Sequence, residues 1–162
     1  MSESLNTRHL TSKCPLFILF ILVCSCHFKL RATHLLIPMD NVQKNHLKSY
    51  GIAFFALEKQ LEVDWLLNYR GGSFALKLND NILKECKVRG VSFEIIADVQ
   101  YNKIVSEITR PEINQDIMKL EKAPKIAVYS PKNKQPWDDA VTLVMSYAEI
   151  PYDIIYDEEI IG

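Results

Sequence analysis

The chain has 162 residues and a formal net charge of −1, with 48% hydrophobic and 24% charged residues, which fits a folded domain with its own core. Residues 34–162 hold 15 basic and 19 acidic residues. This acidic balance excludes a strongly basic nucleic-acid-binding domain, because a phosphate-binding surface needs a basic excess.

The first predicted element is a signal segment. A short apolar run at residues 16–23 follows a polar segment with Arg8 and Lys13, and small and polar residues come after it. The run is too short to span a bilayer core, which takes about 20 apolar residues, and its setting is typical of a secretory signal. A buried core strand or helix is the alternative. We therefore expect residues 1–33 to be a signal peptide and the protein to be exported to the periplasm or cell envelope.

Two processing routes are open for this signal. Residues 23–26, Val-Cys-Ser-Cys, resemble a lipoprotein processing box, and the resemblance implies lipidation of Cys26. Cys24 departs from the small residue usual at its position, and cleavage near Ala32 is the competing route. Acyl chains would hold the protein at a membrane, so we expect membrane contact only through the signal or a lipid anchor.

Apolar patterns and turn residues predict the elements that follow. Strands are expected at residues 35–37, 63–69, 91–96, 125–129 and 152–156. Helices are expected at about 43–60, 80–89, 98–110 and 137–148. Residues 73–78 suit an edge strand or an extended segment, and residues 112–122 suit a short polar helix or a linker.

The helix at 43–60 has the clearest pattern. Its predicted buried face is Leu47, Tyr50, Phe54, Leu57 and Leu61, at helical spacing. Gly51 interrupts this helix, and we expect it to allow a close approach to a sheet.

Two strand–helix–strand stretches, beginning at residues 35 and 125, each have the size of a βαβ unit. The predicted fold is therefore α/β with a mostly parallel sheet. Residues 34–122 form the first α/β unit, and residues 123–162 begin a second βαβ unit. We expect the sheet to be incomplete at the C-terminus, because residues 157–162 read as a loop entering a further helix.

Open parallel sheets bind ligands beyond the C-terminal ends of their strands, where three loops qualify. Backbone amides at a Gly-Gly turn and a nearby guanidinium can receive a carboxylate or phosphate. The predicted ligand-binding residues are Asp40, Arg70, Gly71, Gly72 and Ser130. A plain turn and a solvated arginine are the alternative, and the turn matches neither a dinucleotide fingerprint nor a P-loop.

Catalytic residues stay unassigned. Cys86 is the one cysteine after residue 33, and its lysine neighbours favour a lowered thiol pKa, although a buried idle cysteine is the stronger interpretation. His34 and His46 are the only histidines in this part and do not form a metal-ligand pattern. No cofactor is evident.

Longer strings carry a resemblance. They are HLLIPMD at residues 34–40, VDWLLNYRGGSF at 63–74, LEKAPKIAVYSPKNK at 120–134 and PWDDAVTLV at 136–144. They resemble a family of exported bacterial proteins labelled asparagine synthetase B, over about residues 34–162. The resemblance implies a flavodoxin-like, class I glutamine amidotransferase-like fold. Family members are longer, so it also implies that this chain is an N-terminal fragment and that the rest of the full-length chain is its partner.

The family label implies glutamine-hydrolysing amide transfer to aspartate, on a small amide or carboxylate ligand. However, Ser2 stands where an N-terminal nucleophilic cysteine is needed, and a Ser-Gly-Gly-x-Asp-Ser loop for ATP pyrophosphate is absent from the sequence. Two functions therefore remain open. One is an amidotransferase-like enzyme with its catalytic residues beyond Gly162, and the other is a non-catalytic exported α/β binding protein of the cell envelope.

Overall fold

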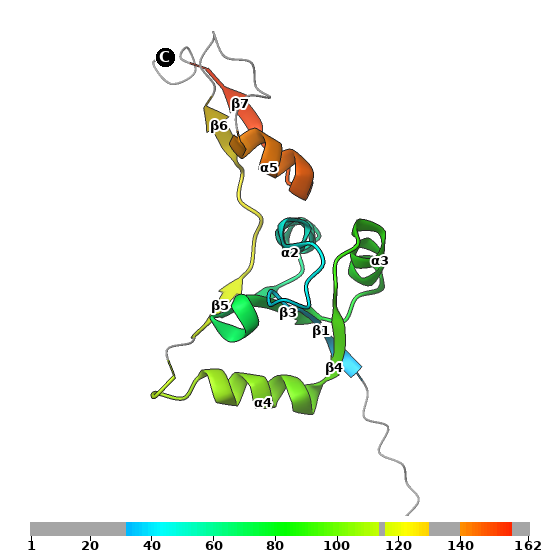
Figure 1. Cartoon of the computed structure of the whole chain (residues 1–162), viewed down its shortest axis with the longest axis vertical. Coiled ribbons are helices and arrows are strands. Elements are labelled where there is room, and N and C mark those ends of the chain that lie inside the picture. Colours follow the sequence, from blue (N-terminus) through cyan, green and yellow to red (C-terminus); the bar gives the residue numbers. More distant parts are fainter. Residues whose placement is uncertain (1–31, 114–115, 130–139, 157–162) are drawn as a thin grey trace, which may run out of the picture. The chain divides into compact units, whose positions relative to one another are not determined.

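A computed structural model describes residues 32–113, 116–129 and 140–156 (Figure 1). The strands are β1 (Ala32–Ile37), β2 (Val63–Leu67), β3 (Ser73–Lys77), β4 (Glu94–Ala97), β5 (Asp116–Leu120), β6 (Ala127–Tyr129) and β7 (Asp153–Ile155). The helices are α2 (His46–Glu58), α3 (Asp80–Arg89), α4 (Asp98–Ile108) and α5 (Ala140–Ala148), with a 3₁₀ turn at Tyr69–Gly71. None of the helices in these ranges has the length and apolar character needed to cross a membrane.

Five strands form one sheet in the order β4-β1-β3-β2-β5, and every neighbouring pair is antiparallel. The predicted mostly parallel, flavodoxin-like sheet is therefore wrong. The reason is β3, which we expected at an edge. The tight turn after β2 folds β3 back between β1 and β2, so it pairs on both sides. The predicted βαβ unit becomes a split one, as in ferredoxin-like topologies.

The strand β5 replaces the predicted polar helix or linker. It pairs along its length with β2, from Val63 opposite Leu120 to Leu67 opposite Asp116. Among the described residues β5 has one strand neighbour, so it lies at a sheet edge. Its side chains are exposed or half-buried, which explains why its sequence carries no strand-like alternation.

Helices cover both faces of this sheet. Figure 1 shows α2 and α3 on one side and α4 on the other. Along β1, Leu35 and Ile37 belong to the core beneath α2 and α3, whereas Leu36 belongs to the core beneath α4. This alternation follows from the two-residue period of a strand, and it places two apolar layers around one sheet.

The buried face of α2 differs from the predicted one. Leu47 and Tyr50 are 40% and 43% exposed, while the buried residues are Ser49, Gly51, Ile52, Ala53, Ala56 and Leu57. Because α2 carries apolar residues around most of its circumference, spacing alone did not single out the face that meets the sheet. Asn45 caps the helix, since its side chain accepts a hydrogen bond from the Lys48 amide at 3.1 Å.

Among the described residues the second sheet has two strands. β6 and β7 pair in parallel, and α5 lies between them in sequence. The helix α5 ends against α2, where a Cβ on Gly51 would lie 1.8 Å from the carbonyl oxygen of Ala148. Gly51 therefore permits a close approach, as expected, but to the end of a helix rather than to a sheet.

The predicted signal lies outside the described residues except for its last two, which open β1. Cys26, Ser130 and Trp137 also lie outside them.

Candidate functional site

Four of the predicted ligand residues meet in one junction. Asp40 follows β1, and Arg70, Gly71 and Gly72 form the turn between β2 and β3. Because β1 and β2 run in the same direction with β3 between them, the segments that follow both strands lie at one end of the sheet. The Met39 amide donates a hydrogen bond to the Arg70 carbonyl at 3.1 Å, which joins the two segments.

The Arg70 side chain is held by two carboxylates. Its Nε donates to Asp40 Oδ2 at 2.6 Å, and its Nη1 donates to Glu94 Oε1 at 2.8 Å. The hydrogen bond from Arg70 lowers the pKa of Asp40, and the same bond raises the pKa of Arg70. One cation between two anions leaves this group negative, so it gives an incoming carboxylate or phosphate little attraction. The sequence did not point to Glu94, which is distant along the chain.

The backbone of this junction is tightly constrained. Asn68 and Arg70 have φ values of 60° and 47°, and Gly71 and Gly72 have 83° and 91°. A Cβ on Gly71 would lie 2.4 Å from the Met39 carbonyl oxygen, so only glycine fits there. The junction is thus a brace that fixes the turn in one conformation.

The brace in turn positions an aromatic side chain. Trp65 on β2 donates its indole N–H to the Gly72 carbonyl at 3.1 Å. Its ring stacks on Phe74 with centroids 6.0 Å apart, and Tyr50 meets Phe74 edge to face at 5.5 Å. These three rings form a continuous aromatic surface, which aromatic pair geometry stabilises.

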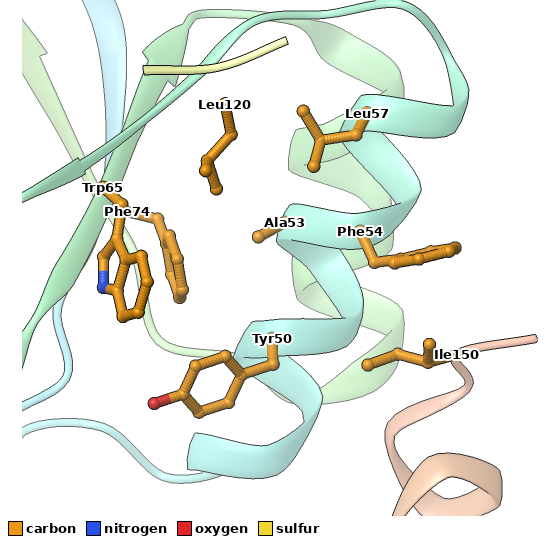
Figure 2. A pocket seen from close by; sticks show the side chains of 8 residues that line it. All are labelled: Tyr50, Ala53, Phe54, Leu57, Trp65, Phe74, Leu120 and Ile150. Atoms are coloured by element: carbon orange, nitrogen blue, oxygen red, sulfur yellow. The ribbon is translucent and has the colours of Figure 1, made fainter. Parts of the chain in front are cut away.

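That surface forms one wall of a hollow with a volume of about 220 Å³. Figure 2 shows the side chains that line it, which come from α2, from strands of the sheet and from the segment after α5; in this view Phe54 points away from Trp65 and Phe74. The lining residues are Tyr50, Ala53, Phe54, Leu57, Trp65, Phe74, Leu120 and Ile150. The part of the sheet beside α2 is therefore left partly uncovered, with an almost wholly apolar lining.

A second, larger hollow of about 430 Å³ has a mixed lining. It lies between the C-terminal part of α2 and the segments that lead into β6 and β7, and charged side chains at Glu58, Lys125 and Asp153 contribute to it. Neither hollow was predicted from the sequence, where Tyr50, Phe54 and Leu57 were assigned to a buried face.

A polar array lies on the α4 side of the sheet. His34 Nδ1 lies 3.0 Å from Asp98 Oδ1, and Thr33 also donates to Asp98. Tyr101 stacks on the His34 ring at 4.1 Å and donates its hydroxyl to Asp64 Oδ2 at 2.6 Å. Burial lowers the pKa of His34 and raises that of Tyr101. His34 is 3% exposed, so its contacts with Asp98 and Tyr101 satisfy a buried polar side chain.

Cys86 is not a reactive thiol. It is fully buried in the core beneath α2 and α3, and burial raises the pKa of its thiol to about 12. The interpretation as a buried cysteine is confirmed, and a pKa lowered by neighbouring lysines is wrong. Within the described ranges, no three His, Cys, Asp or Glu side chains lie as metal ligands would.

No protein-family model, no curated protein and no solved structure matches this chain. The resemblance to the asparagine synthetase B family therefore stays a prediction from the quoted strings.

Proposed function

We propose that the chain acts as a non-catalytic binding protein of the cell envelope, and that its binding site is the aromatic hollow beside α2. The hollow carries this proposal. Binding sites for small molecules are concave and mostly apolar, and an uncovered apolar concavity is costly for a protein unless something occupies it. Export enters the proposal through the predicted signal at residues 1–33.

The amidotransferase alternative draws less support from the described residues. It was expected with a parallel, flavodoxin-like sheet, whereas every neighbouring pair of strands among β1 to β5 is antiparallel. A cysteine nucleophile must reach the thiolate form, and the raised pKa of Cys86 keeps that thiol neutral.

The predicted ligand residues take a supporting role in this proposal. Arg70 is engaged by Asp40 and Glu94, and Gly72 holds the Trp65 indole. They therefore shape the wall of the hollow from outside. The brace keeps the aromatic surface in place, which lowers the ordering cost that a ligand has to overcome on binding.

Two measurements on the full chain test this proposal. Nile red, a neutral dye that brightens in apolar surroundings, should bind with saturation by inserting part of its ring system into the hollow. Ala53→Leu should weaken this binding about tenfold or more, because the larger side chain fills the hollow. Val99→Leu on the exposed side of α4 is the control. Incubation with glutamine should release no ammonia. Ammonia release, or Nile red binding that Ala53→Leu leaves unchanged, contradicts the proposal.

A further inference from the structure

We infer that the hollow selects a neutral aromatic ring as its ligand. This inference rests on the proposed function and adds the chemical class of the ligand. It follows from the charge, the ring geometry and the size of the hollow.

The lining has no acidic or basic side chain, which favours a neutral ligand over an anion. Its eight residues are apolar or aromatic, and none of them is an aspartate, glutamate, lysine, arginine or histidine. The indole N–H of Trp65, which could otherwise orient a polar ligand, is already donated to the Gly72 carbonyl. An anionic group placed here would lose its hydration without gaining a cationic side chain as a partner, so the hollow favours an uncharged group over an anion.

The arrangement of the rings favours an aromatic ligand over an aliphatic one. Trp65 and Phe74 lie offset and nearly parallel, with an interplanar angle of 27°, while Tyr50 stands at 77° to Phe74. Ring atoms of Trp65, Tyr50 and Phe74 therefore line the hollow, although Phe74 itself is only 2% exposed. A planar ring entering it can stack or meet these rings edge to face, which an aliphatic ring of the same size cannot do.

The size of the hollow fits one ring or two fused rings. Its volume is about 220 Å³, whereas apolar cavities of about 150 Å³ in proteins bind benzene. Ile150 lies at the side of the hollow away from Trp65 in Figure 2 and limits its extent there. A long acyl chain would reach beyond the lining residues, so a compact ring is the better match.

Phenol and cyclohexanol test the inference, because they differ in the ring alone. The probe is the indole N–H resonance of Trp65 in the full chain, with Trp137→Phe removing the only other tryptophan. We expect phenol to bind about three- to tenfold more tightly than cyclohexanol, and benzoate, which adds a charge, to bind at least about tenfold more weakly than phenol.

Tyr50→Leu provides the matched variant. It removes the edge-to-face ring but keeps an apolar side chain and leaves Trp65 and Phe74 in place, so we expect the preference for phenol over cyclohexanol to decrease. Tyr129→Leu is the control, since Tyr129 lies on β6 outside the lining and is 44% exposed, against 43% for Tyr50. Both tyrosines are exposed enough for the variants to fold.

The outcomes separate this inference from the proposed function. Cyclohexanol binding as tightly as phenol, or benzoate binding as tightly, overturns the ligand class and leaves an apolar binding site standing. A failure of all three probes and of Nile red overturns both. A preference for phenol that Tyr50→Leu leaves intact also overturns the inference, because the ring geometry would then not be its cause.

Discussion

Gly71 and Gly90 allow the tight junction to be tested with a matched pair of substitutions. Both have positive φ values, 83° and 71°, so alanine at either position costs about 1–2 kcal/mol of backbone strain. A Cβ at Gly71 would lie 2.4 Å from the Met39 carbonyl oxygen, whereas a Cβ at Gly90 meets no atom within 4 Å. Gly71→Ala must therefore also displace Met39 and its hydrogen bond to Arg70, which adds about 1–2 kcal/mol.

We expect the free energy of unfolding to fall by about 1–2 kcal/mol in Gly90→Ala and by about 2–4 kcal/mol in Gly71→Ala. Urea unfolding of the full chain, followed by circular dichroism, gives both values from the midpoint and the slope. With Trp137→Phe in both variants, Trp65 emission should shift in the folded state of Gly71→Ala alone, because the displaced turn carries the carbonyl that holds the indole. Equal losses of stability in the two variants would refute the close approach of the turn to the segment after β1.

Three further predictions concern other parts of the fold. Gly51→Ala should speed amide hydrogen exchange in α5 while leaving β1 to β4 protected, because the added Cβ would lie 1.8 Å from the Ala148 carbonyl oxygen. Unchanged exchange in α5 would contradict that contact. The pKa of His34 is lowered from 6.5 in the folded state, so its neutral form is favoured there. The stability that this group contributes is present above pH 6.5 and is lost as the pH falls through its folded pKa. His34→Gln should therefore flatten that part of a series of urea-unfolding measurements at different pH values. With serine at the cysteines before residue 32, the Cys86 thiol should react with a disulfide reagent at pH 8 only after unfolding, and reaction in the native protein would contradict its burial.

Local patterns predicted most of the elements. The strands β1, β2, β6 and β7, and the helices α3 and α4, lie where turn residues and apolar spacing placed them. Gly90 ends α3 with a φ of 71°, as its position after the helix predicted. These features depend on neighbouring residues, which is why one sequence suffices to predict them.

Strand pairing could not be predicted in the same way. The alternation in β3 is compatible with an edge strand, and its place between β1 and β2 depends on which way the turn at Tyr69–Gly71 directs the chain. The edge strand β5 carries exposed side chains, so it lacks the pattern of a half-buried strand. The fold class was decided by which strands pair with one another in the sheet, and not by the local preferences of the residues within each strand.

The candidate site was predicted in part. Asp40 and Arg70 were placed on neighbouring loops, and they form an ion pair because β1 and β2 run in the same direction on either side of β3. Glu94 completes the group from a distant strand. The hollow was missed because it arises where a helix leaves part of a sheet uncovered, and apolar spacing in α2 does not distinguish a buried face from an open one.

The proposed function places ligands in the aromatic hollow rather than in the junction around Arg70. A map of backbone amide resonances that shift as Nile red is added to the full chain tests it most directly. We predict the largest shifts in α2 from Tyr50 to Leu57 and at Trp65 and Leu120, with smaller shifts at Asp40 and Glu94. Shifts concentrated around Asp40 and Glu94, or spread evenly over the described residues, would contradict the claim.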